Sequence, residues 1–333
     1  ALQAGAAKSI EILSFKEEVT LEKIATREAY GKALVELGQA HGDVVVMDAD
    51  LSKSTKTADF AKAFPERFIN AGIAEQNMIG MAAGLAAAGK TVYASSFAMF
   101  AAGRAFEQVR NSLAYGNLNV RVCATHAGIT VGEDGGSHQA IEDIAIMRSI
   151  PNMRVIVPAD GPSARQAVLK LYGQEGPAYL RLGRSSVPVI YDPDFDFTIG
   201  KGIELRPGTD ATLIACGIMV AKCLEAAKVL AGEGIEVSVV DMHTIKPLDT
   251  ELVIRKAKET GAILTAEEHS IIGGLGSAVC EAVSAGAPVP VLRLGINDTF
   301  GQSGSPDDLL QHYGLTVDQI IHNVRILLKK KQH

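Results

Sequence analysis

The chain has 333 residues, of which 47% are hydrophobic, so it is long enough for two domains that each bury a core. Its formal net charge of −6 is spread along the sequence without a long basic run, which excludes the surface expected of a nucleic-acid-binding protein. No segment approaches the ~20 consecutive apolar residues of a membrane span. The first residues also lack the apolar stretch of a secretory signal, so we expect a soluble cytoplasmic protein without a membrane partner.

Short β-branched runs alternate with longer segments of helical periodicity in the first half of the chain. The expected strands are DVVVMDAD, KTVYASSF, NVRVCATHAG, MRVIVPAD and AYLRLG, and the helical segments include AEQNMIGMAAGLAAAG and FEQVRNSLAYG. These runs are continuously apolar, which indicates strands that are buried on both faces. The pattern predicts a mainly parallel sheet with helices on each side.

A segment rich in Pro and Asp, 186–204, predicts a linker. After it, ATLIACG, IEVSVVDMH, AILTAEEH and VPVLRLGI alternate with helical segments. The last helix is expected to begin at Thr316, because TVDQ has capping-box spacing. The sequence therefore predicts an α/β protein of two doubly wound domains, at 20–185 and 205–330.

Several familiar motifs are absent or incomplete. DADLSKSTKTAD resembles the start of a calcium loop, but Lys53 stands where the turn needs Gly and Asp59 where a bidentate Glu is expected, so we predict no metal ligands. GGLGSA lacks the third glycine of a dinucleotide loop, and there is no phosphate loop or GxSxG elbow. The cysteines lack CxxC spacing and are expected to be buried free thiols: Cys123, Cys216, Cys223 and Cys280.

Polar and aromatic residues follow the ends of four expected strands, in DADLSKST, SSFAMF, THAGITVGEDGGSHQ and RLGR. Ligands of open parallel sheets bind beyond the carboxyl ends of the strands. One surface is therefore expected to collect these side chains: Asp50, Ser54, Phe97, Phe100, His126, Asp134, His138 and Arg184.

Acidic residues also stand at two expected helix starts, where the helix dipole stabilises negative charge. Glu75 enters a helix of small residues in GIAEQNMIGMAAG, and on its own it fits a capping role as well as a functional one. In GEDGGSHQAIED, Glu142 and Asp143 are expected to begin a helix, whereas Glu133 has no assigned role.

Taken in order, GIAEQ, SSFAMF, THAGITVGEDGGSHQAIEDIAIMRSIPNM, PADG and RLGR resemble the thiamine-diphosphate enzymes. Among these, the resemblance is to the pyrimidine-binding and C-terminal domains of transketolase, and it extends from about Thr26 through EEHSIIGGLGSAV and DTFGQSG. It implies a pyrimidine-binding domain, a transketolase C-terminal domain, and transfer of a two-carbon ketol unit between ketose and aldose phosphates of the pentose phosphate pathway.

The resemblance also implies cofactor contacts. Glu75 matches the glutamate that hydrogen-bonds the aminopyrimidine ring of thiamine diphosphate and activates the cofactor. Phe97 and Phe100 match aromatic residues that pack on that ring. Asp50 and Leu51 match a loop that lines the thiazolium side of the cleft.

Substrate contacts follow from the same resemblance. His126, Asp134 and His138 match polar groups of the substrate channel, where imidazoles bind hydroxyls or move protons. Ser54 and Arg184 match residues that hold the sugar phosphate, a task that suits a guanidinium group. A third aromatic found in some transketolases is missing, with Gly103 and Arg104 in its neighbourhood.

The diphosphate-binding domain of such enzymes, whose Gly-Asp-Gly motif and distant Asn bind Mg²⁺, has no counterpart in the sequence. The resemblance therefore implies an N-terminal partner subunit that supplies the Mg²⁺ ligands, and an α2β2 assembly in which this chain self-associates through its pyrimidine-binding domain. Alternatives are the β subunit of a 2-oxo acid dehydrogenase, an enzyme similar to 1-deoxyxylulose-phosphate synthase, and a silent regulatory subunit, because GIAEQ is shared with the first two.

Overall fold

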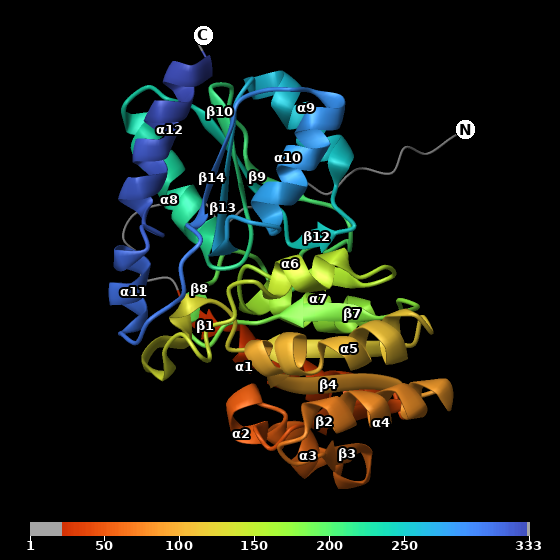
Figure 1. The fold of residues 1–333 in the computed structure, drawn as a ribbon. Coiled ribbons are helices and arrows are strands. Elements are labelled where there is room, and N and C mark those ends of the chain that lie inside the picture. The colour runs from red at the N-terminus through yellow and green to blue at the C-terminus, as the bar shows by residue number, and fades with distance from the viewer. Residues whose placement is uncertain (1–21, 332–333) are drawn as a thin grey trace, which may run out of the picture.

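The computed structural model describes residues 22–331, so residues 20–21 of the expected first domain lie outside the described part. The first domain is built on a seven-stranded sheet in the order β12-β6-β7-β5-β4-β2-β3, in which every strand except β12 runs parallel to its neighbours. A two-stranded antiparallel sheet of β1 and β8 lies beside it (Figure 1).

The elements of the first domain are as follows: β1 (Lys23–Ala25), α1 (Thr26–Ala40), β2 (Val44–Asp48), α2 (Ser52–Thr55), α3 (Ala58–Ala63), η1 (Pro65–Arg67), β3 (Phe68–Asn70), α4 (Glu75–Ala87), β4 (Thr91–Phe97), η2 (Met99–Arg104), α5 (Phe106–Gln108), η3 (Val109–Ala114), β5 (Val120–Thr125), η4 (Ile129–Asp134), α6 (Asp143–Ser149), β6 (Arg154–Ile156), α7 (Gly161–Tyr172), β7 (Ala178–Arg181) and β8 (Ser186–Pro188).

The second domain contains a five-stranded sheet in the order β14-β13-β10-β11-β9, with only β9 antiparallel. Helices α8 and α12 lie on one side of this sheet and α9 and α10 on the other (Figure 1). Its elements are β9 (Ile203–Arg206), β10 (Ala211–Ala215), α8 (Met219–Gly232), β11 (Val237–Asp241), β12 (Thr244–Lys246), α9 (Thr250–Thr260), β13 (Ile263–Ser270), α10 (Leu275–Gly286), β14 (Val291–Ile296), α11 (Pro306–His312) and α12 (Val317–Lys331).

Every strand predicted from a β-branched run is present, and each lies in one of the two large sheets. Helix α12 begins at Val317, and Thr316 Oγ1 accepts a hydrogen bond from the Gln319 amide at 3.2 Å, which confirms the predicted cap. The cysteine prediction is confirmed for Cys123, Cys216 and Cys223, which are buried and free. Cys280, on α10, is free as predicted, but it is partly exposed instead of buried.

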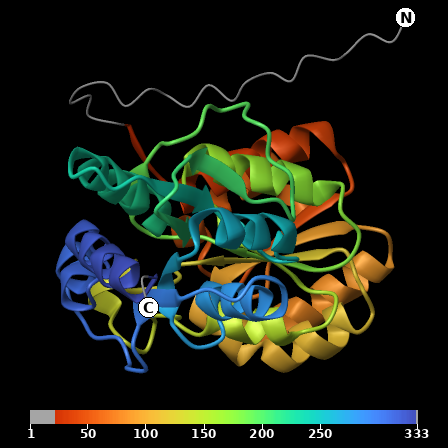
Figure 2. The same ribbon diagram turned by 90° about the horizontal axis from the view of Figure 1, so that it is seen from above.

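The two domains are joined by more than the connecting chain. Strand β12 follows β11 of the second domain, yet it pairs with β6 and so extends the first sheet. In the segment 186–204, Tyr191 is buried and its hydroxyl donates to Asp241 Oδ2 at 2.8 Å. One hydrophobic cluster contains side chains of both domains. The second domain overlaps part of the first when the ribbon is seen from above (Figure 2). Together, these three contacts between the domains determine which loops of the second domain lie against the first sheet.

Candidate functional site

The carboxyl ends of four neighbouring parallel strands meet along one edge of the first sheet. In the order β7-β5-β4-β2, these strands lead into Arg184, His126, Phe97 and Asp50. Adjacent strands lie only about 4.8 Å apart, so residues that are distant in the sequence become neighbours here. The edge predicted from the sequence therefore exists, and four loops converge on it.

Glu75 is the first residue of α4 and is only 1% exposed. Its Oε2 accepts a hydrogen bond from Arg104 Nη1 at 2.9 Å, and its Oε1 accepts one from Ser96 Oγ at 3.4 Å. The helix N-terminus and the Arg104 guanidinium group both place positive potential beside this carboxyl group. Glu75 is thus a buried carboxylate that is held in a fixed position at the sheet edge.

Aromatic rings form a continuous row beside this carboxylate. The Phe97 and Phe100 rings are nearly parallel, with centroids 6.1 Å apart. The His126 ring stacks on Phe97 at 3.9 Å, and His138 meets the edge of Phe100 at 5.3 Å. The Arg104 guanidinium lies 4.7 Å from the Phe100 centroid. A cation therefore covers the Phe100 ring in the region where this sequence lacks a third aromatic residue.

His126 is buried, and its Nδ1 shares a hydrogen bond with Thr125 Oγ1 at 2.9 Å. Burial, with the added repulsion of Arg27, Arg184 and His138, lowers the pKa of His126 to about 3. The imidazole is therefore neutral near pH 7. In this state it can donate or accept a hydrogen bond but does not add positive charge to the site.

The lowered pKa of His126 predicts a pH dependence of stability. An unfolded His binds a proton near pH 6.5, whereas folded His126 stays neutral down to about pH 3, so stability should fall as the pH drops below 6.5. The wild-type free energy of unfolding should decrease between pH 7 and pH 5, and in His126→Gln this decrease should be smaller by about 2 kcal/mol. Urea denaturation at the two pH values measures the difference. His322→Gln, on the exposed face of α12, is the control and should keep the wild-type slope. An unchanged slope for His126→Gln would contradict the assignment.

Positive charge gathers around the end of β7. Arg184 is partly exposed, and its Nη1 donates to the Val131 carbonyl and, at 3.2 Å, to Glu133 Oε2. Arg27, on α1, donates to the Ser54 carbonyl at 2.8 Å. Burial lowers the pKa of Arg27, Glu28 opposes this, and Arg184 lowers the pKa further. Two guanidinium groups and the Ser54 loop thus form a group suited to an anion.

Arg27 was not among the predicted site residues, because it stands in the first turn of a helix far from Arg184 in the sequence. In the sequence, Arg27 is only an arginine in the first turn of a partly buried helix, and arginines are common at such positions without any role in binding. The sequence also left Glu133 without a role, and the structure gives it one as the exposed ion-pair partner of Arg184.

A buried carboxylate organises the loop that carries Asp50, Leu51 and Ser54. Asp48 Oδ1 accepts from the Leu51 amide at 2.5 Å, and its Oδ2 accepts from Thr55 Oγ1 at 2.6 Å. Burial raises the pKa of Asp48, although these hydrogen bonds favour its charged form. Asp50 is exposed, has a positive φ of 64°, and exchanges hydrogen bonds with Asn70 at 3.1 Å. The loop is therefore rigid at its base and open at Asp50.

The segment 126–139, called the site loop below, follows β5 and contains η4. Gly128, Gly132 and Gly135 have φ values of 80°, 86° and 75°, which are accessible mainly to glycine. Asp134 is exposed at the end of η4, and His138 Nδ1 shares a hydrogen bond with Ser137 Oγ at 3.0 Å. Backbone hydrogen bonds, such as those from the Gly135 amide to the Gly132 carbonyl at 3.1 Å and from the His138 amide to the Gly135 carbonyl at 3.0 Å, link turns of the loop to one another.

The helix predicted to begin at Glu142 and Asp143 is present, but the helix dipole is not the main interaction of Asp143. Asp143 is 1% exposed, and its Oδ2 accepts from Arg181 Nε at 2.8 Å and from Tyr179 OH at 2.6 Å. Burial alone would raise the pKa of Asp143, but Arg181 and His269 more than offset this, so its pKa lies below the ordinary value. Asp143 is therefore half of a buried ion pair under the site loop.

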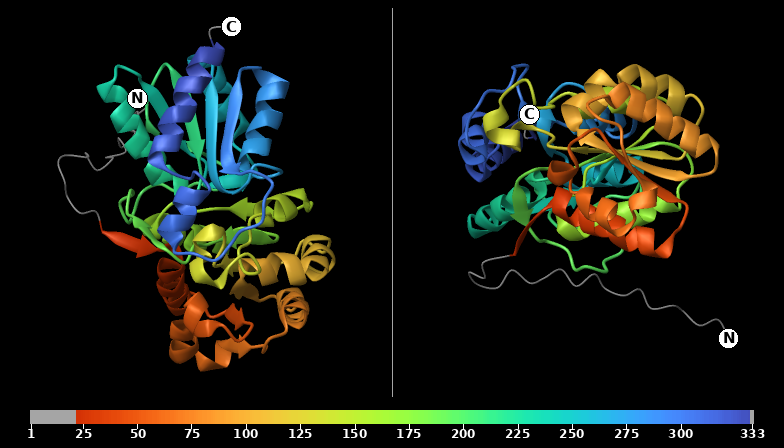
Figure 3. Two further views of the ribbon diagram at one scale, coloured as in Figure 1. Left: turned by 60° about the vertical axis from the view of Figure 1, so that its left-hand side comes forward. Right: turned by 90° about the horizontal axis from the view of Figure 1, so that it is seen from below.

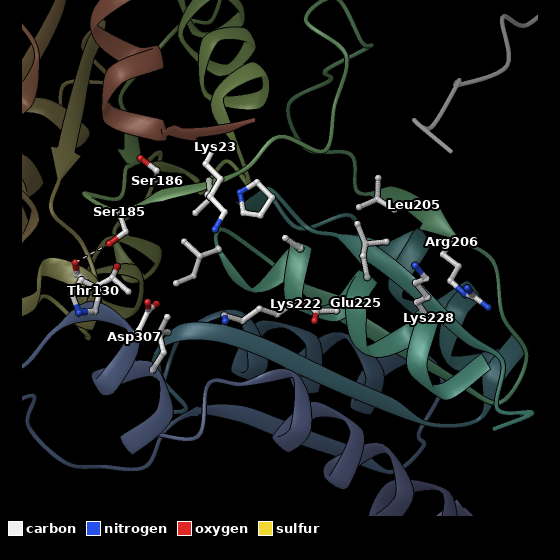
Figure 4. Close-up of a pocket in the computed structure, with 17 residues that line it drawn as sticks. Lys23, Thr130, Ser185, Ser186, Leu205, Arg206, Lys222, Glu225, Lys228 and Asp307 are labelled. Atoms are coloured by element: carbon white, nitrogen blue, oxygen red, sulfur yellow. Dashed lines mark hydrogen bonds between the residues drawn. The ribbon is translucent and has the colours of Figure 1, made fainter. Parts of the chain in front are cut away.

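Two further hollows in the described part of the chain lie outside the sheet edge, although Thr130 of the segment 126–139 lines the larger one. The larger, of about 810 Å³, lies between Lys23 and Ser186 of the small sheet and Lys222 of α8 (Figure 4). None of the ten predicted site residues lines either hollow. Within residues 22–331, no three His, Cys, Asp or Glu side chains are grouped to hold a metal, and none of the described helices is long and apolar enough to cross a membrane.

Comparison with known families decides the classification. The family model described as the transketolase pyrimidine-binding domain matches residues 22–189, and the transketolase C-terminal domain matches 200–320. The chain belongs to the transketolase family. Its two α/β domains are thus the pyrimidine-binding and C-terminal domains of that family, as expected from the sequence.

Individual relatives of this transketolase-family chain are similar over nearly all of it. A putative transketolase C-terminal section from Methanocaldococcus jannaschii is 53% identical over 92% of this chain and 96% of the relative. A 6-deoxy-6-sulfo-D-fructose transketolase subunit from a Clostridium species is 43% identical over 94% of this chain and 98% of the relative. A solved structure described as a split gene transketolase, inactive beta4 tetramer, is 58% identical, with a TM-score of 0.87 over 92% of this chain and 99% of that one.

Proposed function

We propose that this chain is the C-terminal subunit of a split transketolase, which transfers a two-carbon ketol unit between ketose and aldose phosphates. It would use thiamine diphosphate and be completed by a separate diphosphate-binding subunit. The observation that carries the proposal is the meeting, at one sheet edge, of the buried Glu75, the Phe97–Phe100 pair and the cationic group of Arg27 and Arg184. The names of the relatives support it.

The residues beside Glu75 fit the pyrimidine half of the cofactor. Glu75 is held out of water, where it can share a proton with a ring nitrogen. Phe97 and Phe100 present flat faces that suit stacking on a heteroaromatic ring, and Asp50 and Leu51 would line its other side. When bound, thiamine diphosphate supplies the electron sink of the reaction.

The described residues do not fit the diphosphate half. A magnesium ion that bridges a diphosphate needs several oxygen ligands, and residues 22–331 group no three acidic or histidine side chains for it. We assign the magnesium ligands to the partner subunit. The chain would bind, orient and protect only the pyrimidine end.

The rest of the sheet edge fits a phosphorylated sugar. Arg27, Arg184 and Ser54 would hold the phosphate group, and the neutral His126 would donate a hydrogen bond to it or to a neighbouring hydroxyl. The exposed Asp134 and the partly exposed His138 would accept and donate hydrogen bonds to the sugar hydroxyls. Glu133 must release Arg184 when an anion arrives, since both compete for the same guanidinium group.

Replacing Arg184 by Gln should raise the KM for a phosphorylated sugar by about 10- to 100-fold, because one charge-assisted contact to the phosphate is lost. The KM for the same sugar without phosphate should change little. Arg206→Gln is the matched control, since Arg206 also forms an ion pair with a glutamate, Glu236, but lies on β9 away from the sheet edge. Steady-state kinetics of the assembled enzyme measure both. Equal KM changes for both substrates would contradict the assignment.

The expected assembly is α2β2, with two copies of this chain in contact through their first domains. Two glycines of α4, Gly80 and Gly84, have open space where a side chain would begin, so a second helix could approach closely. The related structure described as an inactive beta4 tetramer supports both self-association and a need for a partner. The clostridial relative's name suggests that the sugar differs among such subunits, so a sulfonated ketose is a second substrate to test.

The test is to co-purify the diphosphate-binding subunit with this chain and assay the mixture with thiamine diphosphate and Mg²⁺. Ketol transfer from a ketose phosphate, absent with either subunit alone, is the expected result. Oxidative turnover of pyruvate would favour a 2-oxo acid dehydrogenase β subunit, and formation of a deoxyketose phosphate from pyruvate would favour the synthase alternative. A rate unchanged by Glu75→Ala would favour a silent regulatory subunit.

A further inference from the structure

One buried carboxylate of the second domain reaches into the site loop of the first. Glu268 stands on β13 and is 4% exposed. Its Oε1 accepts a hydrogen bond from the backbone amide of Thr130 at 2.7 Å. A Cβ atom at Gly128 would lie only 2.3 Å from the same oxygen, so this glycine allows the carboxylate to approach the loop backbone.

The hydrogen bond between Glu268 and Thr130 affects the position of Arg184, one of the two guanidinium groups of the proposed anion site. The next residue, Val131, accepts with its carbonyl from Arg184 Nη1, and Ser185 Oγ donates to the Thr130 carbonyl at 3.3 Å (Figure 4). The backbone of η4 is thus fixed from one side by Glu268 and orients Arg184 on the other. A shift at Thr130 would move the guanidinium group that we assign to the sugar phosphate.

The surroundings explain how Glu268 can be buried. Burial raises the pKa of Glu268, and the nearby Arg181 opposes this. Arg181 Nη2 also donates to the backbone carbonyls of Glu268 at 3.0 Å and Ala140 at 3.1 Å, so one guanidinium group joins β13 to the end of the site loop. The carboxylate is therefore compensated in place and needs no water.

Other contacts from the second domain reach the same loop at different points. Gln139 Nε2 donates to the Gln302 carbonyl at 2.9 Å, and Ser303 Oγ donates to the Glu133 carbonyl at 2.7 Å. Helix α11 packs beside η4, as the left view of Figure 3 shows. Among these contacts, Glu268 alone is a fully buried charged side chain bonded to the loop backbone.

We propose that Glu268 is a positioning residue through which the C-terminal domain sets the shape of the site loop and thereby the place of Arg184. The proposal rests on the proposed function for its effect on the sugar phosphate, but the anchoring of the loop does not depend on it. The hydrogen bond to Thr130, and not the charge of Glu268, does the positioning.

Two variants separate the effect of the length of the Glu268 side chain from the effect of its charge. Glu268→Gln keeps the length of the side chain and an oxygen that can accept from the Thr130 amide. Glu268→Asp keeps the charge but withdraws it by one carbon–carbon bond, about 1.5 Å, which breaks the contact. The Gln variant should behave as wild type, and the Asp variant should release the loop.

Hydrogen exchange of the Thr130 amide, measured on the full chain, tests directly whether Glu268 holds the site loop. Glu268→Asp should speed exchange of the Thr130 amide by about 10- to 100-fold and leave the amides of β4 unchanged. Ser303→Ala, which removes the contact to Glu133, is the control and should not alter Thr130. Exchange at Thr130 that is unchanged in the Asp variant, or equally fast in the Gln variant, would overturn the proposal.

Kinetics of the assembled enzyme then test the effect on the site. Glu268→Asp should raise the KM for a phosphorylated sugar about 10-fold with little change in kcat, and Glu268→Gln should restore it. If exchange responds as expected but no variant or wild-type assembly transfers a ketol unit, the proposed function fails and the anchoring stands. If the assembly is active and the Asp variant keeps the wild-type KM, the positioning role is refuted and the function stands.

Discussion

Replacing Glu75 by Gln should lower the kcat of the assembled enzyme by about 10²- to 10⁴-fold, the range typical for removing a general acid or base. Gln fits the buried site at the start of α4 and can still accept a hydrogen bond from Arg104, so the fold is expected to survive. It cannot, however, exchange a proton with a ring nitrogen. Steady-state ketol transfer by the mixed subunits measures the loss.

The matched control for Glu75 is Glu107→Gln. Glu107 lies on α5, is exposed, and bonds only its neighbours Gln108 and Asn111 among the described residues, so its replacement should leave kcat unchanged. Circular dichroism on both variants checks that the fold is intact. A Glu75→Gln enzyme that keeps more than about a tenth of the wild-type kcat would contradict the role proposed for this carboxylate.

Replacing Arg181 by Met should destabilise the chain by about 3–5 kcal/mol, because it leaves a buried charge without its partner. Arg181 and Asp143 are 5% and 1% exposed, and no water can replace the lost guanidinium group without opening the domain contact. The free energy of unfolding in urea measures the effect.

Two comparisons sharpen the Arg181 result. The double variant Arg181→Met, Asp143→Leu should recover part of the loss, since neither charge is then buried alone, but not all of it, since Arg181 also bonds the carbonyls of Ala140 and Glu268. Arg325→Met removes an exposed ion pair with Glu233 and should leave the free energy of unfolding nearly unchanged. A loss below 1 kcal/mol for Arg181→Met would contradict the account of the pair.

Much of the fold follows from local patterns in the sequence. Runs such as VVVMD and VRVCAT are continuously apolar, and each forms an interior strand of the first sheet. Strand β12 has three residues and pairs across the domain boundary with β6, so no local sequence pattern predicts it. Short edge strands depend on long-range packing, which is why β1, β3, β8 and β9 were also not predicted.

The site was predictable only in part, for a related reason. The rule that ligands bind beyond the carboxyl ends of parallel strands brings Asp50, Phe97, His126 and Arg184 to one edge, and the structure has them there. Side chains that act from other elements escaped, because their contacts depend on tertiary packing. Arg27 comes from the helix that follows β1, and Arg104 turns back to Glu75 from the end of η2.

The second domain was also underestimated from the sequence. EEH was assigned to a predicted strand and to the family resemblance, with no role in the site, yet its second glutamate, Glu268, bonds the backbone of the site loop. Asp143 was assigned to a helix dipole, whereas burial against Arg181 dominates its surroundings. In both cases the decisive partner lies in another element, and its proximity is a property of the fold.

The most direct test of the central claim is calorimetric titration of thiamine diphosphate, with Mg²⁺, into this chain, into its co-purified partner, and into the mixture. A site that is divided between two chains predicts binding to the mixture alone, with one cofactor for each pair of unlike subunits and with weaker binding when Glu75 is replaced by Ala. Binding of equal strength to this chain by itself, or a mixture that binds no cofactor, would contradict the account.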